Sequence, residues 1–137
     1  VEFQVRDAGL LPREKGIGVD PVGIGDIVDE LLDPERGITQ EQIIGISQGW
    51  KLQAAIKTTE RKLAGGELDH GGSRLMAWCV GNAKVEPRGN AILITKQASG
   101  TAKIDPLMAT FNAVALMALN PGAQEPSVYE SRGVIAL

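Results

Sequence analysis

The sequence has 137 residues, of which 43% are hydrophobic and 23% charged, and its formal net charge at pH 7 is −3. These values predict one soluble α/β domain with a single core, and no run reaches the ~18 apolar residues that a membrane span needs. The chain has a single cysteine, Cys79, which excludes an internal disulfide and fits a reducing compartment. Its place in the apolar run RLMAWCVG predicts a position in the core.

The N-terminal residues VEFQVRDAGL lack the basic start and the apolar centre of a signal peptide. They begin without Met inside an amphipathic, helix-like segment. We therefore expect a piece of a longer protein that is not exported.

The charges divide the chain into three blocks. Residues 1–48 carry ten acidic and four basic side chains, residues 49–103 carry nine basic and four acidic ones, and residues 104–137 carry three acidic and one basic. A basic middle block is typical of a surface that binds a polyanion, but charges scattered over solvated helix faces give similar counts. The charge pattern alone leaves both interpretations open.

In chain order, the first half predicts two β-α units. Residues 16–19 suit a buried strand, and the chain then turns at Asp20-Pro21 into a helix with Ile24, Ile27, Val28, Leu31 and Leu32 on one face. Residues 43–46 predict a second strand, followed by the loop SQG and a helix over residues 50–63 that ends at two glycines. The apolar face of this helix should contain Leu52, Ala55, Ile56, Thr59 and Leu63. Successive β-α units indicate neighbouring parallel strands.

The second half predicts a helix over residues 74–81 and a hairpin of the runs AKVEP and NAILITK, joined by Arg88-Gly89. A further helix should run from Pro106 to about residue 119 and be buried nearly all round, because its only polar side chains are Thr110 and Asn112. Asn120-Pro121-Gly122 should end it, and the tail allows a short terminal strand. The predicted architecture is a mixed sheet covered by helices.

Asp20 and Asp105 occupy matching contexts, since each follows a β-branched residue, precedes a Pro and stands where a helix is expected. An N-cap Asp ahead of Pro stabilises a helix by about 1 kcal/mol, so capping is the favoured role of each on the residues alone. Asp20, however, follows a strand, and ligands of α/β sheets gather at the carboxyl ends of strands. Converging carboxylates without His or Cys would form a hard-oxygen site for Mg²⁺ or Mn²⁺, and a pair of such ions is a standard device for phosphodiester hydrolysis.

Other chemistries find no motif in the sequence. It contains no GxxxxGK[ST] phosphate loop, no GxSxG elbow and no GxGxxG followed by an acid at the expected distance. His70, the only histidine, lies in an expected loop and is interpreted as solvated, with a phosphate contact as the alternative. Trp50 and Trp78 are interpreted as core or groove residues rather than as base-stacking ones.

Four segments carry a family resemblance: GVDPVGIGDIVDEL, GISQGWKLQAAIKTTERKLAGGELDHGG, LMAWCVGNAKVEPRGNAILITKQASGTAKIDPLMATFNAVALM and SVYESRG. The most specific features are Leu68-x-His70, Trp78 with Asn82, Lys96, and KIDP ahead of a helix of small residues. In this order, from about Gly16 to Gly133, the segments resemble the C-terminal nuclease region of a tailed-phage terminase large subunit.

This resemblance implies an RNase H-like fold in which a cluster of acids binds divalent metal and cuts concatemeric phage DNA during genome packaging. In such nucleases one acid lies on the first strand, a second at the end of a later strand and a third just before a late helix. Asp20 matches the second and Asp105 the third, whereas Glu2 and Asp7 lie in a helix-like stretch and do not match the first. We therefore expect residues 1–137 to be one nuclease domain that lacks the first strands and the preceding ATPase, with an incomplete two-ion site and little activity.

The resemblance also implies partners and further site residues. The partners would be double-stranded phage DNA, the portal protein and the terminase small subunit in the cytoplasm of a bacterial host, with no membrane. The candidates for holding DNA are Lys96, Lys103, Arg88, His70 and Asn82. Two alternatives stay open: a noncatalytic module that docks on DNA or on the portal, with both Asp residues as caps, and another RNase H-like nuclease such as a junction resolvase.

Overall fold

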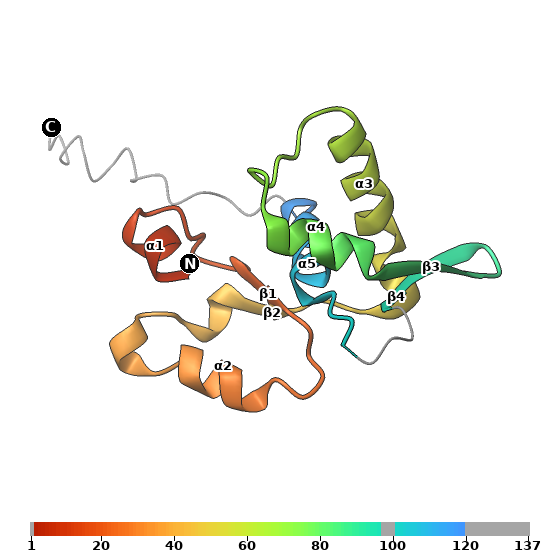
Figure 1. Ribbon diagram of the computed structural model, residues 1–137. Helices are drawn as coiled ribbons and strands as arrows, with labels where there is room; N and C mark the ends of the chain where they lie inside the picture. Colours follow the sequence, from red (N-terminus) through yellow and green to blue (C-terminus); the bar gives the residue numbers. More distant parts are fainter. Residues whose placement is uncertain (1, 97–100, 120–137) are drawn as a thin grey trace, which may run out of the picture.

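The structure is a computed structural model, which describes residues 2–96 and 101–119 (Figure 1). Its helices and strands are α1 (Glu2–Asp7), β1 (Ile17–Val19), α2 (Gly25–Leu31), β2 (Ile43–Gly45), α3 (Gln53–Ala64), α4 (Arg74–Gly81), β3 (Ala83–Arg88), β4 (Ala91–Lys96) and α5 (Asp105–Met117). Three short 3-10 turns complete it: η1 (Pro34–Arg36), η2 (Gln40–Gln42) and η3 (Gly49–Leu52). The expected helix stop at residues 120–122 and the tail strand lie outside the described residues.

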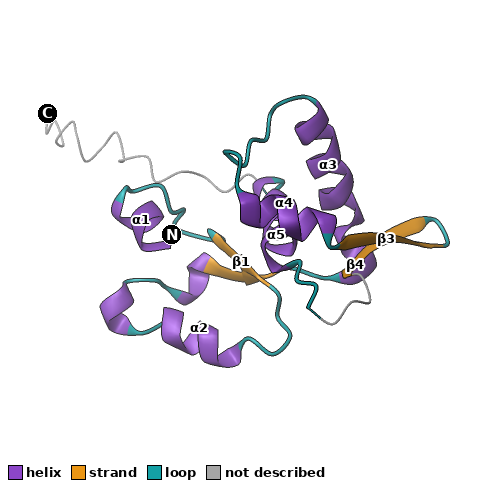
Figure 2. Ribbon diagram, in the orientation of Figure 1, coloured by secondary structure: helices purple, strands orange, loops and turns teal. Residues whose placement is uncertain are grey.

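β1 and β2 form a parallel pair, which confirms the prediction from the two β-α units. Val19 lies opposite Gly45, and just beyond them the Ile46 amide donates to the Val19 carbonyl oxygen at 2.7 Å. Figure 2 shows this pair between the N-terminal helices and the rest of the molecule. Since parallel strands end at the same edge, Asp20 and the loop that follows Ile46 leave the sheet side by side.

β3 and β4 form the predicted antiparallel hairpin, with Ala83 opposite Lys96 at its open end and Arg88 opposite Ala91 at its tip. The expectation of one mixed sheet is wrong for the described residues, because this hairpin and the β1–β2 pair are two separate sheets. Pro87 offers a physical reason, since it has no N–H to donate and a strand with an internal Pro takes an edge position. The chain is nevertheless α/β, as predicted.

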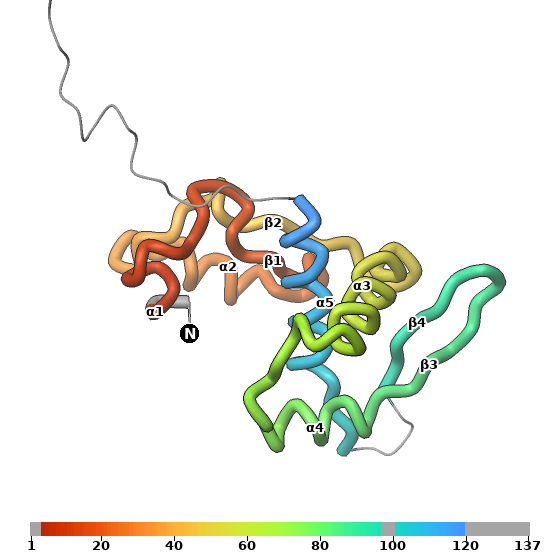
Figure 3. The backbone as a smooth tube through the Cα atoms, turned by 90° about the horizontal axis from the view of Figure 1, so that it is seen from above, coloured from red at the N-terminus to blue at the C-terminus, as the bar shows by residue number. Residues whose placement is uncertain are grey.

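The core surrounds α5, which packs against β1, α3 and α4 (Figure 3). Its buried side chains are Ile46, Leu52, Ala55, Ile56, Phe111, Val114 and Leu116. β1 approaches closely because Gly18 has no side chain: a Cβ there would lie 2.8 Å from Leu116 Cδ1 and 2.9 Å from Ile46 Cγ1. Gly18 therefore allows the strand that leads to Asp20 to lie directly on α5.

The prediction that α5 is buried nearly all round is wrong. Ala109, Ala113 and Met117 are exposed, and their spacing of four residues places them along one stripe of the helix. Apolar composition predicts that a helix can be buried, but the number of elements that pack against it decides how much is. In the described part of the chain, α5 is covered on the sides that face β1, α3 and α4.

The other helices follow the sequence closely, apart from some of their apolar faces. α4 has the predicted bounds, begins with a hydrogen bond from the Met76 amide to Ser73 Oγ at 3.2 Å, and buries Cys79 completely, as expected. α3 ends at Gly65 as predicted, although η3 forms its expected first turn. Leu63 and Ile27 were expected on buried faces and are exposed, and α2 has no fully buried residue.

No helix within residues 2–96 and 101–119 has the length and apolar character to cross a membrane.

Candidate metal and DNA site

Asp20 stands at the carboxyl end of β1, where the predicted metal site requires it. Its carboxylate is exposed, and its Oδ1 accepts a hydrogen bond from the Val22 amide at 3.0 Å. This contact, two residues along the chain, makes a tight turn of the Asx type. Helix α2 begins only at Gly25, with Ile24 as its N-cap residue. The interpretation of Asp20 as a helix cap is therefore wrong, because the residues after Pro21 form a turn before any helix starts.

Asp105 is the first residue of α5 rather than the residue before it. Ile104 occupies the N-cap position, and no side chain caps this helix end within the described residues. The capping interpretation is therefore wrong for Asp105 as well. Its exposed carboxylate lies in the first turn, where the positive end of the helix dipole favours negative charge.

β1, which leads to Asp20, packs on α5, but the contact of Gly18 lies at the end of the helix opposite Asp105. Gly18, two residues before Asp20, contacts Leu116 in the last turns of α5, whereas Asp105 lies in its first turn. Among the described residues, no three His, Cys, Asp or Glu side chains gather into a group that could hold a metal ion. The predicted site has only two such side chains, Asp20 and Asp105. The absence of a group of three therefore does not decide whether these two carboxylates lie close together, and their closeness stays a prediction.

Three of the five candidate DNA-binding residues gather around the start of α5. The Asn82 side-chain amide donates to the Lys103 carbonyl oxygen at 3.0 Å, which fixes the chain two residues before Asp105. Lys96 lies opposite Ala83, the neighbour of Asn82, at the open end of the hairpin. Both lysines are exposed. The backbones of Lys96 and Lys103 therefore lie near the chain that leads into Asp105, and Asn82 holds the Lys103 backbone in place.

Of the other two candidates, Arg88 lies away from this group, whereas His70 lies near the first turns of α5. Arg88 is exposed at the tip of the hairpin, five residue pairs from Lys96 along the ladder. His70 is exposed in the loop between α3 and α4, at a mostly apolar hollow of about 270 Å³ that Leu107 and Thr110 of α5 also line. His70 therefore lies beside the first turns of α5 but faces apolar neighbours.

One polar contact near the site was not foreseen in the sequence. The Gln48 side-chain amide donates to Asn112 Oδ1 at 3.0 Å and to the Ile46 carbonyl oxygen at 2.8 Å. It ties the loop after β2 to the buried middle of α5, because Asn112 is only 7% exposed. The signal available in the sequence was Asn112 itself, since a polar side chain in an apolar helix requires a partner when it is buried.

The two tryptophans also differ from expectation. Trp50, in η3, is 65% exposed, and Trp78, in α4, is 47% exposed. The core alternative is therefore wrong for both, and the groove alternative stays a prediction. Their rings lie on the outside because the residues that anchor their segments to the core are Leu52 and Cys79.

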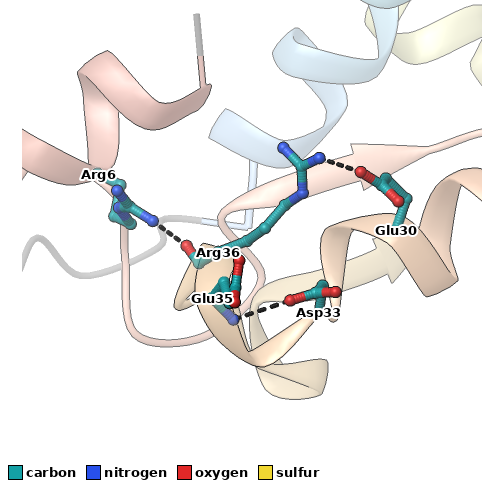
Figure 4. Close-up of a pocket in the computed structure, with 5 residues that line it drawn as sticks. All are labelled: Arg6, Glu30, Asp33, Glu35 and Arg36. Atoms are coloured by element: carbon teal, nitrogen blue, oxygen red, sulfur yellow. Dashed lines mark hydrogen bonds and ion pairs between the residues drawn. The ribbon is translucent and has the colours of Figure 1, made fainter.

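A second, polar hollow of about 530 Å³ lies between α1 and the chain after α2 (Figure 4). Arg6 donates to the Arg36 carbonyl oxygen, Arg36 forms an ion pair with Glu30, and the Glu35 amide donates to Asp33 Oδ1 at 2.9 Å. These contacts join charged groups of opposite sign to one another and to the backbone. None of the candidate site residues lines this hollow.

Two glutamates outside the site have shifted titration. The pKa of Glu67 lies below its ordinary value because Lys62 Nζ donates to its carboxylate at 2.6 Å. The pKa of Glu41 is lowered by a hydrogen bond from its own backbone amide and by another from the Thr39 side chain. Both carboxylates are exposed, so these lowered pKa values arise from surface contacts and do not mark a catalytic centre.

Exposed carboxylates at a strand end and at a helix start can bind the divalent ions of phosphodiester hydrolysis, and exposed lysines can contact phosphates. The family model of the terminase large subunit endonuclease domain matches residues 15–120, and the chain belongs to this family. Membership indicates a nuclease that interacts with DNA and has a role in cutting it during packaging. It confirms the terminase part of the resemblance, while a phage source and a C-terminal position in the large subunit stay predictions. No curated protein and no solved structure gives a significant match.

Proposed function

We propose that the chain is the metal-dependent endonuclease part of a terminase large subunit and cuts concatemeric phage DNA during genome packaging. The observation that carries the proposal is the family match over residues 15–120. The large subunit would come from a tailed phage or prophage. Its nuclease domain would have an RNase H-like sheet whose first strands lie upstream of these residues, and an ATPase would precede that domain.

We propose Asp20 and Asp105 as ligands of Mg²⁺ or Mn²⁺. Both carboxylates are exposed, and oxygen ligands are those that these ions prefer. A metal site with sulfur or nitrogen ligands has less support, because Cys79 is fully buried and His70 lies beside an apolar hollow. When bound, two such ions supply an activated water and stabilisation of the leaving oxygen in phosphodiester hydrolysis.

The residues around the start of α5 would hold the DNA backbone. Lys96 and Lys103 are exposed and carry charges that phosphates attract, and the hydrogen bond from Asn82 fixes the backbone of Lys103. Arg88 would contact the same duplex from the hairpin tip, and His70 would contribute a phosphate contact from its loop. Contacts of this kind carry no base information, so binding should be sequence-independent and sensitive to salt.

The wider setting follows from the same proposal. Double-stranded phage DNA would be the substrate, the portal protein and the terminase small subunit would be partners, and the bacterial cytoplasm would be the place of action. A noncatalytic docking module is the second candidate, and it is favoured by the hydrogen bond from Val22 to Asp20, which already gives this carboxylate a structural role. The two candidates differ in whether the carboxylates are needed for cutting.

Plasmid nicking by the parent large subunit in Mn²⁺ tests the proposal. Asp105→Asn should lower the rate at least about 100-fold, because losing a metal ligand misplaces the reacting groups and raises the barrier by several kcal/mol. Asp69→Asn is the matched control: Asp69 is also exposed, and its Oδ1 accepts a hydrogen bond from the Gly71 amide at 2.7 Å. Its rate should be unchanged. Comparable nicking by Asp105→Asn and the unmodified protein would favour the docking module.

A further inference from the structure

The Trp50 side chain has surroundings that packing does not explain. The indole is 65% exposed, although burying so large a ring is strongly favourable. Lys51 Nζ lies over the ring, 5.8 Å from its centroid, which is within the range of a cation–π contact. An exposed aromatic ring with a cation against one face leaves the other face available for a flat partner.

The segment that carries Trp50 is held firmly on both sides. Before it, Gln48 is bonded to Asn112 and to the Ile46 carbonyl oxygen. After it, Leu52 is only 2% exposed and belongs to the core. Trp50 is therefore presented by a short, anchored turn, and little conformational entropy would be lost on binding a ligand.

The turn lies at the edge of the sheet where the proposed metal site begins. It follows β2, whose last residue, Gly45, pairs with Val19, and Pro21 beside Asp20 lies against Gly45. The hairpin tip reaches the same surface, since the Gln53 side-chain amide donates to the Asn90 carbonyl oxygen at 3.3 Å. Arg88, which pairs with Ala91 at this tip, lies two residues from Asn90, and Gln53 lies two residues after Lys51. We call Trp50, Lys51 and Arg88 the Trp50 surface.

We propose that the Trp50 surface binds an unpaired nucleobase of DNA, with Trp50 stacking on the base and Lys51 and Arg88 contacting the adjoining phosphates. The inference rests on the proposed function and adds the form of DNA that is bound. Every base offers a flat face to an aromatic ring, and the two cations match the charge of the backbone. Unpaired bases occur at frayed ends and at the ends that cutting creates, so this surface would hold an end beside the metal site.

The chain contains two tryptophans, so each can be removed and the other used as a reporter. Trp fluorescence is followed while oligothymidylate is added without divalent metal. Stacking should quench the fluorescence of the unmodified protein and of Trp78→Phe, but not that of Trp50→Phe. Trp50→Ala should weaken binding about tenfold, in the range found for loss of one base stack, and Trp78→Ala, the matched exposed control, should not.

A second titration keeps this inference apart from the proposed function. Binding of a fluorescein-labelled, blunt duplex, followed by anisotropy, reports the general DNA contact through the lysines. Two results would overturn the inference alone, provided that the duplex still binds. One is equal quenching by oligothymidylate in Trp50→Phe and in the unmodified protein. The other is an unchanged affinity of Trp50→Ala for oligothymidylate. Failure to bind either DNA would overturn both. Circular dichroism of each variant checks the fold, which a 65% exposed side chain should not determine.

Discussion

The dipeptide Asp-Pro follows a β-branched residue twice in this chain, and its two copies fold differently. After Asp20 the chain makes a turn closed by the Val22 amide, and the next helix begins several residues later. Asp105 and Pro106, in contrast, are already the first residues of α5. The residues that follow explain the difference, because Gly23 has a positive φ of 68° that no helix contains, while Asp105-Pro106 leads into the helix-forming run LMA.

The comparison shows that matching sequence contexts do not imply matching structural roles. The Asp20 carboxylate accepts a hydrogen bond from the backbone of its own turn. The Asp105 carboxylate is stabilised by the helix dipole and does not cap the helix. What the two share is exposure and the packing of β1 on α5. A common function must therefore be tested through the contact between the two segments and through the coupling between the two charges.

The largest effect is expected where β1 lies on α5. Gly18→Val would place atoms within 3 Å of the buried Leu116 and Ile46 side chains, so strand and helix must move apart. We expect the free energy of unfolding to fall by about 1–3 kcal/mol, as is usual for overpacking. Urea denaturation measures it.

The matched control is Gly25→Ala, because a Cβ at Gly25 would meet no atom within 4 Å and α2 starts there. This change should leave stability unchanged or raise it by up to about 1 kcal/mol. If Gly18→Val proved as harmless as Gly25→Ala, β1 and α5 would not be in close contact at Leu116.

A smaller effect distinguishes the two aspartates from each other. If their carboxylates share an ion site, they repel one another by about 1 kcal/mol in water at 4 Å when no metal is present. Asp20→Asn keeps an oxygen for the Val22 amide and should raise the free energy of unfolding by about 0.5–1 kcal/mol at low salt. Asp105→Asn should change it little, because the same relief is offset by about 0.3–1 kcal/mol of lost helix-dipole stabilisation.

The double variant completes this cycle. With both charges removed there is no repulsion left to relieve, so it should be no more stable than Asp20→Asn alone. Additive effects in the cycle, with Asp20→Asn neutral and Asp105→Asn destabilising, would mean that the carboxylates lie too far apart to share an ion.

Much of the fold was readable from the sequence because it depends on local patterns. Apolar periods and the two glycines after residue 64 predicted α3, an apolar run predicted α4, Arg88-Gly89 predicted the hairpin, and the two β-α units predicted a parallel pair. Exposure was harder to predict, as Trp50 and the Met117 side of α5 show, because it depends on which elements pack where. The separation into two sheets was likewise missed, since strand pairing between distant segments leaves little local trace.

The candidate site divides in the same way. Asp20 and Asp105 stand at a strand end and a helix start, as their motifs indicated, but their different turns depend on the residues that follow. The bond from Asn82 to the Lys103 carbonyl spans 21 positions and cannot be derived from either segment alone. The distance between the two carboxylates is a property of the same kind.

Calorimetric titration with Mn²⁺ tests most directly whether Asp20 and Asp105 hold metal together. The unmodified chain is compared with Asp20→Asn, Asp105→Asn and the control Asp69→Asn, which removes an exposed carboxylate from another turn of the same type. We predict measurable heat of binding for the unmodified chain and for Asp69→Asn, and affinity at least about tenfold weaker in each of the other two variants. Equal binding by all four proteins, or binding by none, would contradict the assignment of these two aspartates as metal ligands.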